Sequence, residues 1–293
     1  MADVAGPAAH RSVPRAACRA AVAAAVILIG GLAITLLTRV PGYGRTRRGA
    51  LGLHVLSRVL LRALGIRVVS RGAPRSGASL VVANQVSWID VLVVHAAGPM
   101  VPVVREDFCG SPLIRAVFAR AGAVIVGTRS RRGVPGSVEQ IADLLRRGHR
   151  VQVFGESVVV GGTATNTFHR ATFQAAIDAA VVISPVALAH RTVGTMSPPI
   201  ADLAGDDLIG PMWRVLRNGP VTVRAHWLPV IPAVVGAGHP AVHRAAAATR
   251  AERAIATALG HPVTVGRQRV ALALVPSAVH FSAGKRFAHP RVA

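Results

Sequence analysis

The first strong feature of the hydrophobic pattern is an uncharged run near the start of the chain. From Ala20 to Thr38 there are 19 consecutive residues without a charge, rich in Ala, Val, Ile and Leu, between Arg19 and Arg39. A helix of that length reaches about 28 Å, close to the thickness of a bilayer's hydrocarbon core. A signal peptide normally has a shorter apolar region followed by a small-residue cleavage site. The run therefore predicts a membrane helix, with a signal peptide or a buried core helix as the alternatives.

A second periodic segment, residues 48–64, follows directly. Its leucines fall on one helical face, and basic residues spaced four apart fall on another. The two sets are Leu53, Leu56, Leu60 and Leu64, and His54, Arg58 and Arg62. This pattern is typical of a helix that lies in the membrane interface, and an ordinary amphipathic helix that covers the core is the alternative.

Beyond Gly65 short apolar runs alternate with longer segments of helical period. The predicted strands are Ile66–Ser70, Ser79–Asn84, Val101–Val104, Ala123–Gly127, Val151–Phe154, Val181–Leu188 and Val221–Leu228. The predicted helices are Val86–Ala96, Pro112–Ala121, Ser137–Arg147 with a capping box from Ser137 to Gln140, His169–Ala179 and Ala241–Leu259. This alternation predicts an α/β fold, with a mixed, mainly parallel sheet flanked by helices and preceded by the membrane helix and the interfacial helix.

The same pattern predicts the organisation of the chain. Residues 1–65 are expected to form an N-terminal membrane-anchoring segment, with its apolar helix at 20–38 and its amphipathic helix at 48–64. Residues 66–260 are expected to form the α/β domain, and residues 261–293 a basic, poorly ordered tail.

Charge narrows the class of partner. The chain carries 34 basic and 12 acidic residues, a formal net charge of +22, which predicts an anionic partner. Aromatic residues make up 4% of the chain and the charge is spread along its length, so nucleic acid is not expected as a partner. Basic residues are more numerous after the apolar run than before it, which favours a body on the cytoplasmic face of the cell membrane. The two cysteines, Cys18 and Cys109, predict neither a disulfide framework nor a metal site.

Four of the 12 acidic residues, Asp90, Glu106, Asp107 and Glu156, fall at the ends of predicted strands or the starts of helices, where α/β proteins build their sites. The sharpest cluster is Asn84-Gln85-Val86-Ser87-Trp88-Ile89-Asp90, at a strand-to-helix junction. One interpretation is local: Ser87 or Asn84 caps the helix and Asp90 complements its first turn.

The cluster also resembles a motif of the glycerolipid acyltransferase family, whose members similar to 1-acylglycerol-3-phosphate acyltransferase carry Asn-His-x-Ser-Trp-x-Asp. Further segments match in the family's order and spacing over about residues 51 to 259. They include Arg105-Glu106, Ser111–Ile114, Ala121–Val126, Val151–Ser157, Phe168-His169-Arg170, Pro185–Leu188 and Gly205-Asp206-Asp207.

The resemblance implies acyl transfer from a thioester to a lipid hydroxyl. In the family the motif histidine is the base that removes the hydroxyl proton, and the aspartate orients it. Gln85 stands where that histidine is expected, so Gln85 and Asp90 are the candidate catalytic positions. A carboxamide does not take up a proton at neutral pH, and Gln85 could only hold the acceptor hydroxyl by a hydrogen bond. Among other histidines, His95 lies about 140° round the helix from Asp90, and His169 and His190 would need a rearranged site.

The resemblance also implies the substrate-binding positions, which are Asn84, Ser87, Arg105, Thr128, Arg129 and Glu156. Thr128 stands where the family has its phosphate-binding arginine, and Arg129 comes one position later. The family's Phe-Pro-Glu-Gly-Thr turn becomes Phe154-Gly155-Glu156-Ser157-Val158, which keeps the glutamate but loses the Pro and the Gly of the turn.

Two functions therefore stay open. The chain is expected to be a membrane-associated acyltransferase-like protein of glycerolipid metabolism that uses acyl-CoA or acyl carrier protein and a lysophosphatidic acid-like acceptor. Alternatively, it is an inactive relative that binds lipid or a partner. The resemblance implies membrane lipids and a lysophospholipid as partners, no metal and no bound cofactor, with the acyl carrier as cosubstrate.

Overall fold

The computed structural model describes most of the chain. The described residues are 12–40, 45–85, 87–106, 109, 112–127, 133–160, 163–192, 216, 221–233 and 240–260. The described residues all belong to one compact unit, and residues 261–293, predicted to form a basic tail, lie outside the described part.

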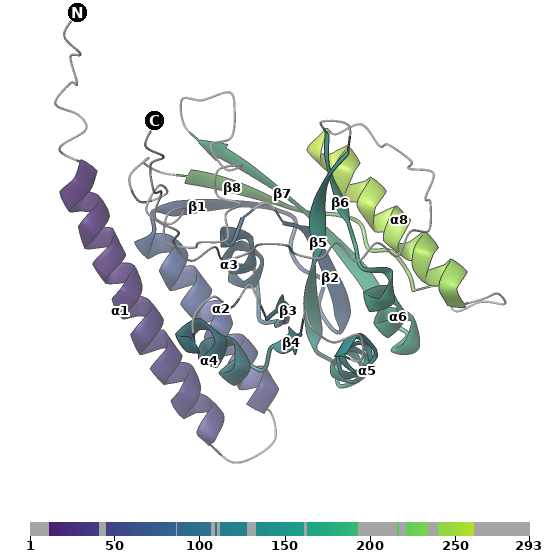
Figure 1. Ribbon diagram of the computed structural model, residues 1–293, viewed down its shortest axis with the longest axis horizontal. Coiled ribbons are helices and arrows are strands. Elements are labelled where there is room, and N and C mark those ends of the chain that lie inside the picture. The colour runs from purple at the N-terminus through teal and green to yellow at the C-terminus, as the bar shows by residue number, and fades with distance from the viewer. Residues whose placement is uncertain are drawn as a thin grey trace, which may run out of the picture. The chain divides into compact units, whose positions relative to one another are not determined.

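The unit is built on one sheet, in the order β1-β8-β7-β2-β5-β3-β4 (Figure 1). Its strands are β1 Ile66–Arg71, β2 Ser79–Asn84, β3 Val101–Arg105, β4 Val124–Val126, β5 Arg150–Val160, β6 Thr163–Thr167, β7 Val182–Thr192 and β8 Val221–Trp227. Neighbours pair in parallel except β7 with β8 and β5 with β6. The predicted mixed, mainly parallel sheet is confirmed.

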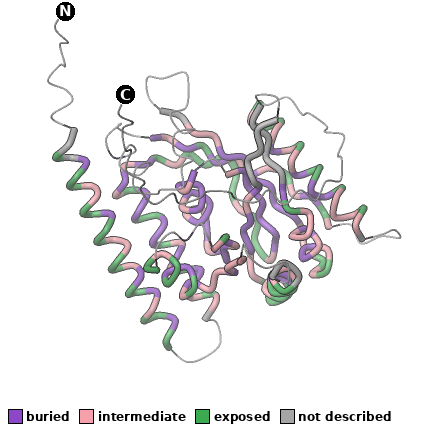
Figure 2. The backbone as a smooth tube through the Cα atoms, viewed as in Figure 1, coloured by how far each residue is buried: buried purple, intermediate pink, exposed green. Residues whose placement is uncertain are grey.

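Helices cover both faces of this sheet (Figure 1). They are α1 Ser12–Arg39, α2 Arg45–Ala63, α3 Ile89–Ala96, α4 Pro112–Arg120, α5 Gly133–Arg146, α6 Arg170–Asp178 and α8 Pro240–Leu259. The core on one face joins α1, α2 and α3 to the strands, and the core on the other joins α5, α6 and α8 to them. All six residues of β2 are buried, as expected for a central parallel strand with helices on both sides (Figure 2).

Local predictions at β5 and α5 were wrong. β5 does not end at Phe154 but runs to Val160 and forms a hairpin with β6, which the sequence pattern did not reveal. The residues from Val158 to Val160 are β-branched, which favours a strand. Gly155 stands where the family has a proline, so a backbone N–H is present there for strand pairing. The capping box also fails, because α5 begins at Gly133 and Ser137 lies inside the helix.

The leucine face of α2 does not face lipid. Leu53, Leu56, Leu60 and Leu64 are all at most 7% exposed and pack in the cores shared with α1, α3 and α4. The structure therefore favours the second alternative for this face, an amphipathic helix that covers the core.

The apolar helix α1 lies against α2, and small residues allow the close approach. A Cβ atom on Gly30 of α1 would come within 2.5 Å of Leu56, and one on Gly52 of α2 within 2.7 Å of Ile34. The other side of α1 is exposed, with Leu28, Ile29, Leu32 and Leu36 between 54% and 69% accessible (Figure 2).

Candidate active site

The candidate residues gather where parallel strands end. β2 pairs in parallel with both β5 and β7, and β3 pairs in parallel with β5, so the carboxyl ends of these four strands share one edge of the sheet. Asn84 ends β2, Arg105 ends β3, and His190 lies near the end of β7. α/β proteins place their sites at this edge.

Asp90 is fixed in the first turn of α3, just beyond that edge. Its Oδ2 accepts a hydrogen bond of 2.8 Å from the Ser87 backbone N–H, and the carboxyl side chain is 0% exposed. The helix-start role predicted for Asp90 is therefore present, although the residue at the cap position is Trp88, which makes no side-chain capping bond. Ser87 is itself buried, with its Oγ 3.4 Å from the Ile89 backbone nitrogen.

The second carboxylate oxygen of Asp90 contacts a histidine from another part of the chain. His190 Nε2 lies 2.6 Å from Asp90 Oδ1, and the imidazole is 3% exposed. Alternate side chains of a strand share a face, so His190 projects on the face of Val186 and Leu188, which pack in the same core as α3. A carboxylate only accepts hydrogen bonds, so in the neutral ring the hydrogen is on Nε2 and the lone pair is on Nδ1. That Nδ1 is buried, and it has no hydrogen-bond partner among the described residues.

Asn84, predicted to bind substrate, links β2 to β7 instead. Its Nδ2 donates to the Leu188 carbonyl at 2.9 Å, and its Oδ1 accepts from the Leu188 backbone N–H at 2.7 Å. The side chain is buried, and these two bonds fix β7 two residues before His190. The amide therefore holds the strand that carries the imidazole.

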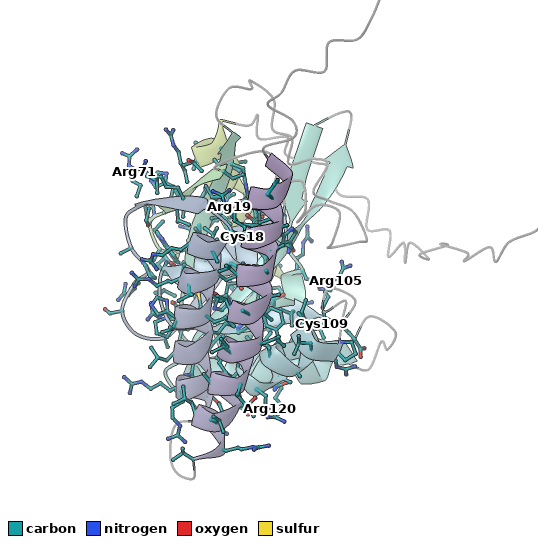
Figure 3. The ribbon with its side chains drawn as sticks, turned by 90° about the vertical axis from the view of Figure 1, so that its left-hand side faces the viewer. Cys18, Arg19, Arg71, Arg105, Cys109 and Arg120 are labelled. Carbon is teal, nitrogen blue, oxygen red and sulfur yellow. The ribbon has the colours of Figure 1, made fainter. Side chains whose placement is uncertain are left out.

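The remaining candidate residues differ in their position and exposure relative to Asp90 and His190. Gln85 directly follows β2 and is half-buried. Arg105 is exposed and extends outward from the end of β3 (Figure 3). Glu156 continues β5, where its backbone pairs with Thr167 of β6. Thr128 and Arg129 lie outside the described residues.

The other two histidines considered from sequence do not reach Asp90 by any contact that the structure gives. His95 lies in the last turn of α3, within the core. Its burial lowers its pKa to about 3, while a contact with Gln152 acts in the opposite direction and the charge of His54 in the same one. It is therefore neutral at physiological pH. His169 is exposed and precedes α6, which covers the opposite face of the sheet from α3.

The contact between His190 and Asp90 was not predicted from the sequence. The predicted strand ended at Leu188, whereas β7 runs to Thr192 and includes His190. One signal was available: a histidine two residues past a predicted central strand lies at the edge where the Asn84–Asp90 segment emerges. Within the described residues, no group of three His, Cys, Asp or Glu side chains could hold a metal ion, and the expectation of no cofactor stays a prediction.

Comparison with known proteins identifies relatives of this chain. The family model described as Acyltransferase matches residues 65–189, from β1 to the residue before His190. A lyso-ornithine lipid O-acyltransferase of Pseudomonas aeruginosa is 31% identical over 231 residues, which are 77% of this chain and 85% of that protein. The chain belongs to the acyltransferase family. A second acyltransferase, the 1-acyl-sn-glycerol-3-phosphate acyltransferase of Neisseria meningitidis, is 31% identical over 183 residues, 61% of this chain and 71% of that protein.

The fold also matches a solved structure of an acyltransferase. The 1-acyl-sn-glycerophosphate (LPA) acyltransferase PlsC of Thermotoga maritima superposes with a TM-score of 0.59 at 14% identity, covering 87% of this chain and 98% of that one. At this identity the likeness concerns the fold alone.

Proposed function

We propose that this acyltransferase-family chain is an active enzyme that moves an acyl group from acyl-CoA or acyl carrier protein to the hydroxyl of a lysolipid. The observation that carries the proposal is the buried Asp90 carboxylate, paired with an imidazole at the carboxyl edge of the sheet. Ester formation from a thioester needs a group that accepts the hydroxyl proton and a second group that orients it. A pair of this kind meets both needs without a resident metal or organic cofactor.

The acceptor is expected to carry an anionic group. Relatives are named for lyso-ornithine lipid and for 1-acyl-sn-glycerol-3-phosphate, so both lysolipids are candidates here. The net charge of +22 favours an anionic headgroup. Arg105, exposed at the same strand edge as Asp90, is a candidate for binding it, because a guanidinium fork can bind a phosphate or carboxylate with two hydrogen bonds.

A second candidate function is that of an inactive lipid-binding relative. Gln85 favours it, since this position follows β2 where the family resemblance calls for a histidine, and so does the continued strand at Glu156. The Asp90–His190 contact argues against it, because a disused site has no need of an oriented imidazole.

The proposal includes attachment to the cytoplasmic face of the cell membrane through α1. Residues Ala16–Arg39 form a helix apolar and long enough to cross a bilayer, with a mean hydropathy of 2.6. One side of that helix packs against α2, which leaves the exposed side, with Leu28, Ile29 and Leu32, to contact lipid. Each such side chain contributes roughly 1.5–3 kcal/mol when it is removed from water.

Activity is tested with the purified full-length chain in detergent. It is mixed with acyl-CoA or acylated carrier protein and with lysophosphatidic acid or lyso-ornithine lipid, and the diacyl product is measured by mass spectrometry. The proposal expects turnover of at least one acceptor. If no donor and acceptor pair gives product while lysolipid still binds, the inactive relative is the better description.

Membrane attachment has a separate test. Salt at 1 M shortens the Debye length to about 3 Å and so screens the attraction between arginines and lipid headgroups. It does not weaken the burial of apolar area, so a wash of membranes with 1 M salt should leave the protein bound. Changing Ile29 and Leu32 to Gln should increase release, whereas Val69→Gln on β1, also an exposed apolar residue, should not. Full release of the native chain by salt would contradict attachment through α1.

A further inference from the structure

We propose that His190 is the general base of this site, the role that the family resemblance would give to a histidine at position 85, where this chain has Gln85. The inference rests on the proposed acyl transfer and adds the identity of the group that takes the proton. In the described part of the chain, His190 is the histidine in hydrogen-bond contact with Asp90, at 2.6 Å.

The orientation of the ring suits the role. Asp90 Oδ1 accepts the Nε2–H, which sets the tautomer and places the lone pair on Nδ1. Asp90 is held in turn by the Ser87 backbone N–H, at 2.8 Å. The chain thus contains a base, a carboxylate that orients it and a backbone donor that fixes the carboxylate, which is the arrangement by which enzymes orient a catalytic imidazole.

The position of the ring is fixed by two strands. His190 pairs with Val223 of β8 on one side of β7. On the other side, the Asn84 side chain binds both the N–H and the carbonyl of Leu188. Asn84 directly precedes Gln85 in the chain, and its side chain holds the strand that carries His190. Asn84 is therefore a positioning residue.

Within the described residues one nitrogen of the ring has no partner, and this points to a ligand. Nδ1 of His190 is buried, and no described residue bonds to it. A buried acceptor without a partner destabilises a protein unless something donates to it. A purely structural His–Asp link needs only Nε2. A lysolipid hydroxyl would donate to Nδ1 and so meet the base at the atom that has the lone pair.

The proposed acyl transfer needs His190, Asp90 and the two substrates. Nδ1 of His190 takes the hydroxyl proton as the lysolipid oxygen forms a bond to the thioester carbonyl carbon. Asp90 stabilises the positive charge that develops on the imidazole. The carbon–sulfur bond then breaks, the leaving thiolate takes the proton from His190, and an ester and a free thiol leave with the ring neutral again.

His190→Gln tests this directly in the full-length chain. A glutamine amide can still donate to Asp90 Oδ1, so the structural contact is kept while the base is lost. We expect kcat to fall about 10²–10⁴-fold, the usual contribution of a positioned base, with KM and the melting temperature little changed. His226→Gln, on the adjacent strand β8 and paired with Ala187, is the matched control and should keep the native kcat.

Different results would contradict the role of His190 and the proposed acyl transfer. A kcat within about threefold of native in His190→Gln, or an equal loss in His226→Gln, would overturn His190 as the base while acyl transfer stands. A native chain that acylates no acceptor would overturn both. If His190→Gln does not fold, nitrogen-15 NMR of the native chain with labelled histidine decides: at neutral pH Nδ1 of His190 should carry no proton, and a proton on Nδ1 would overturn the proposal.

Discussion

Asp90→Asn separates the structural and the catalytic work of the carboxylate. The substituted amide would turn its oxygen to the fixed Ser87 N–H and its NH₂ toward His190, so both contacts persist as neutral hydrogen bonds. Charge-assisted bonds contribute about 1.5–3 kcal/mol and neutral ones about 0.5–1.5. The expected loss is about 1 kcal/mol per bond, or about 2 kcal/mol of the free energy of unfolding.

The rate of catalysis should fall by much more than the stability, because Asp90→Asn reverses the tautomer of the His190 ring. With an amide NH₂ facing it, Nε2 of His190 must accept a hydrogen bond, and the ring hydrogen moves to Nδ1, where the lone pair was needed. In serine proteases the corresponding change lowers kcat about 10⁴-fold, so we expect a loss of about 10³–10⁴-fold here. At 1.36 kcal/mol per tenfold, that is about 4–5.5 kcal/mol of barrier, well above the stability cost.

The assay measures initial rates with saturating donor and acceptor, beside urea unfolding followed by circular dichroism in the same detergent. Asp143→Asn is the control, because Asp143 is 52% exposed and pairs with Arg146 on α5. It should change stability by less than about 0.5 kcal/mol and leave the rate unaltered. A rate for Asp90→Asn within a few-fold of native would refute the tautomer argument.

Three further predictions concern stability. Burial lowers the pKa of His95 to about 3, so below about pH 6.5 the unfolded chain binds a proton there that the folded chain does not. The free energy of unfolding should therefore fall by about 1.4 kcal/mol per pH unit as the pH drops towards about 3. In urea unfolding, His95→Gln should reduce this pH dependence. Gly49→Ala should cost about 1–3 kcal/mol in urea unfolding, because its Cβ would lie 2.6 Å from a backbone oxygen after α4, whereas Gly136→Ala, with open space, should cost nothing. Glu252→Ala should cost about 1–3 kcal/mol by leaving the Phe168 N–H unpaired, while Glu252→Gln keeps that 3.0 Å bond and most of the stability measured by the same method.

Much of the fold could be predicted because each element carries its own period. The interior of β2, from Leu80 to Ala83, is an uninterrupted apolar run, and the predicted bounds of the strand, Ser79–Asn84, are those observed. Periodicity identified the leucine face of α2 but not what covers it, since water, lipid and protein all favour the same stripe. The β5–β6 hairpin was missed because the strand was expected to end at Phe154, where the family has a turn. The β-branched residues from Val158 to Val160, which continue the strand, were not taken into account.

The site was predicted only on the side that is local in sequence. Asp90 could be found because Ser87, its backbone partner, is three residues away. Its other partner, His190, is 100 residues away, and the two meet only because β7 pairs with β2. Strand order depends on long-range packing, which a single sequence does not reveal.

The most direct test of catalysis by a His190–Asp90 unit is the kcat of the double variant His190→Gln/Asp90→Asn beside the two single variants. Residues that act as one unit lose their effect together, so removing the second costs little once the first is gone. We expect the double variant to turn over within about threefold of the slower single variant. Losses that multiply, so that the double variant is slower by the product of the two single effects, would show that the residues act independently and would contradict the paired mechanism.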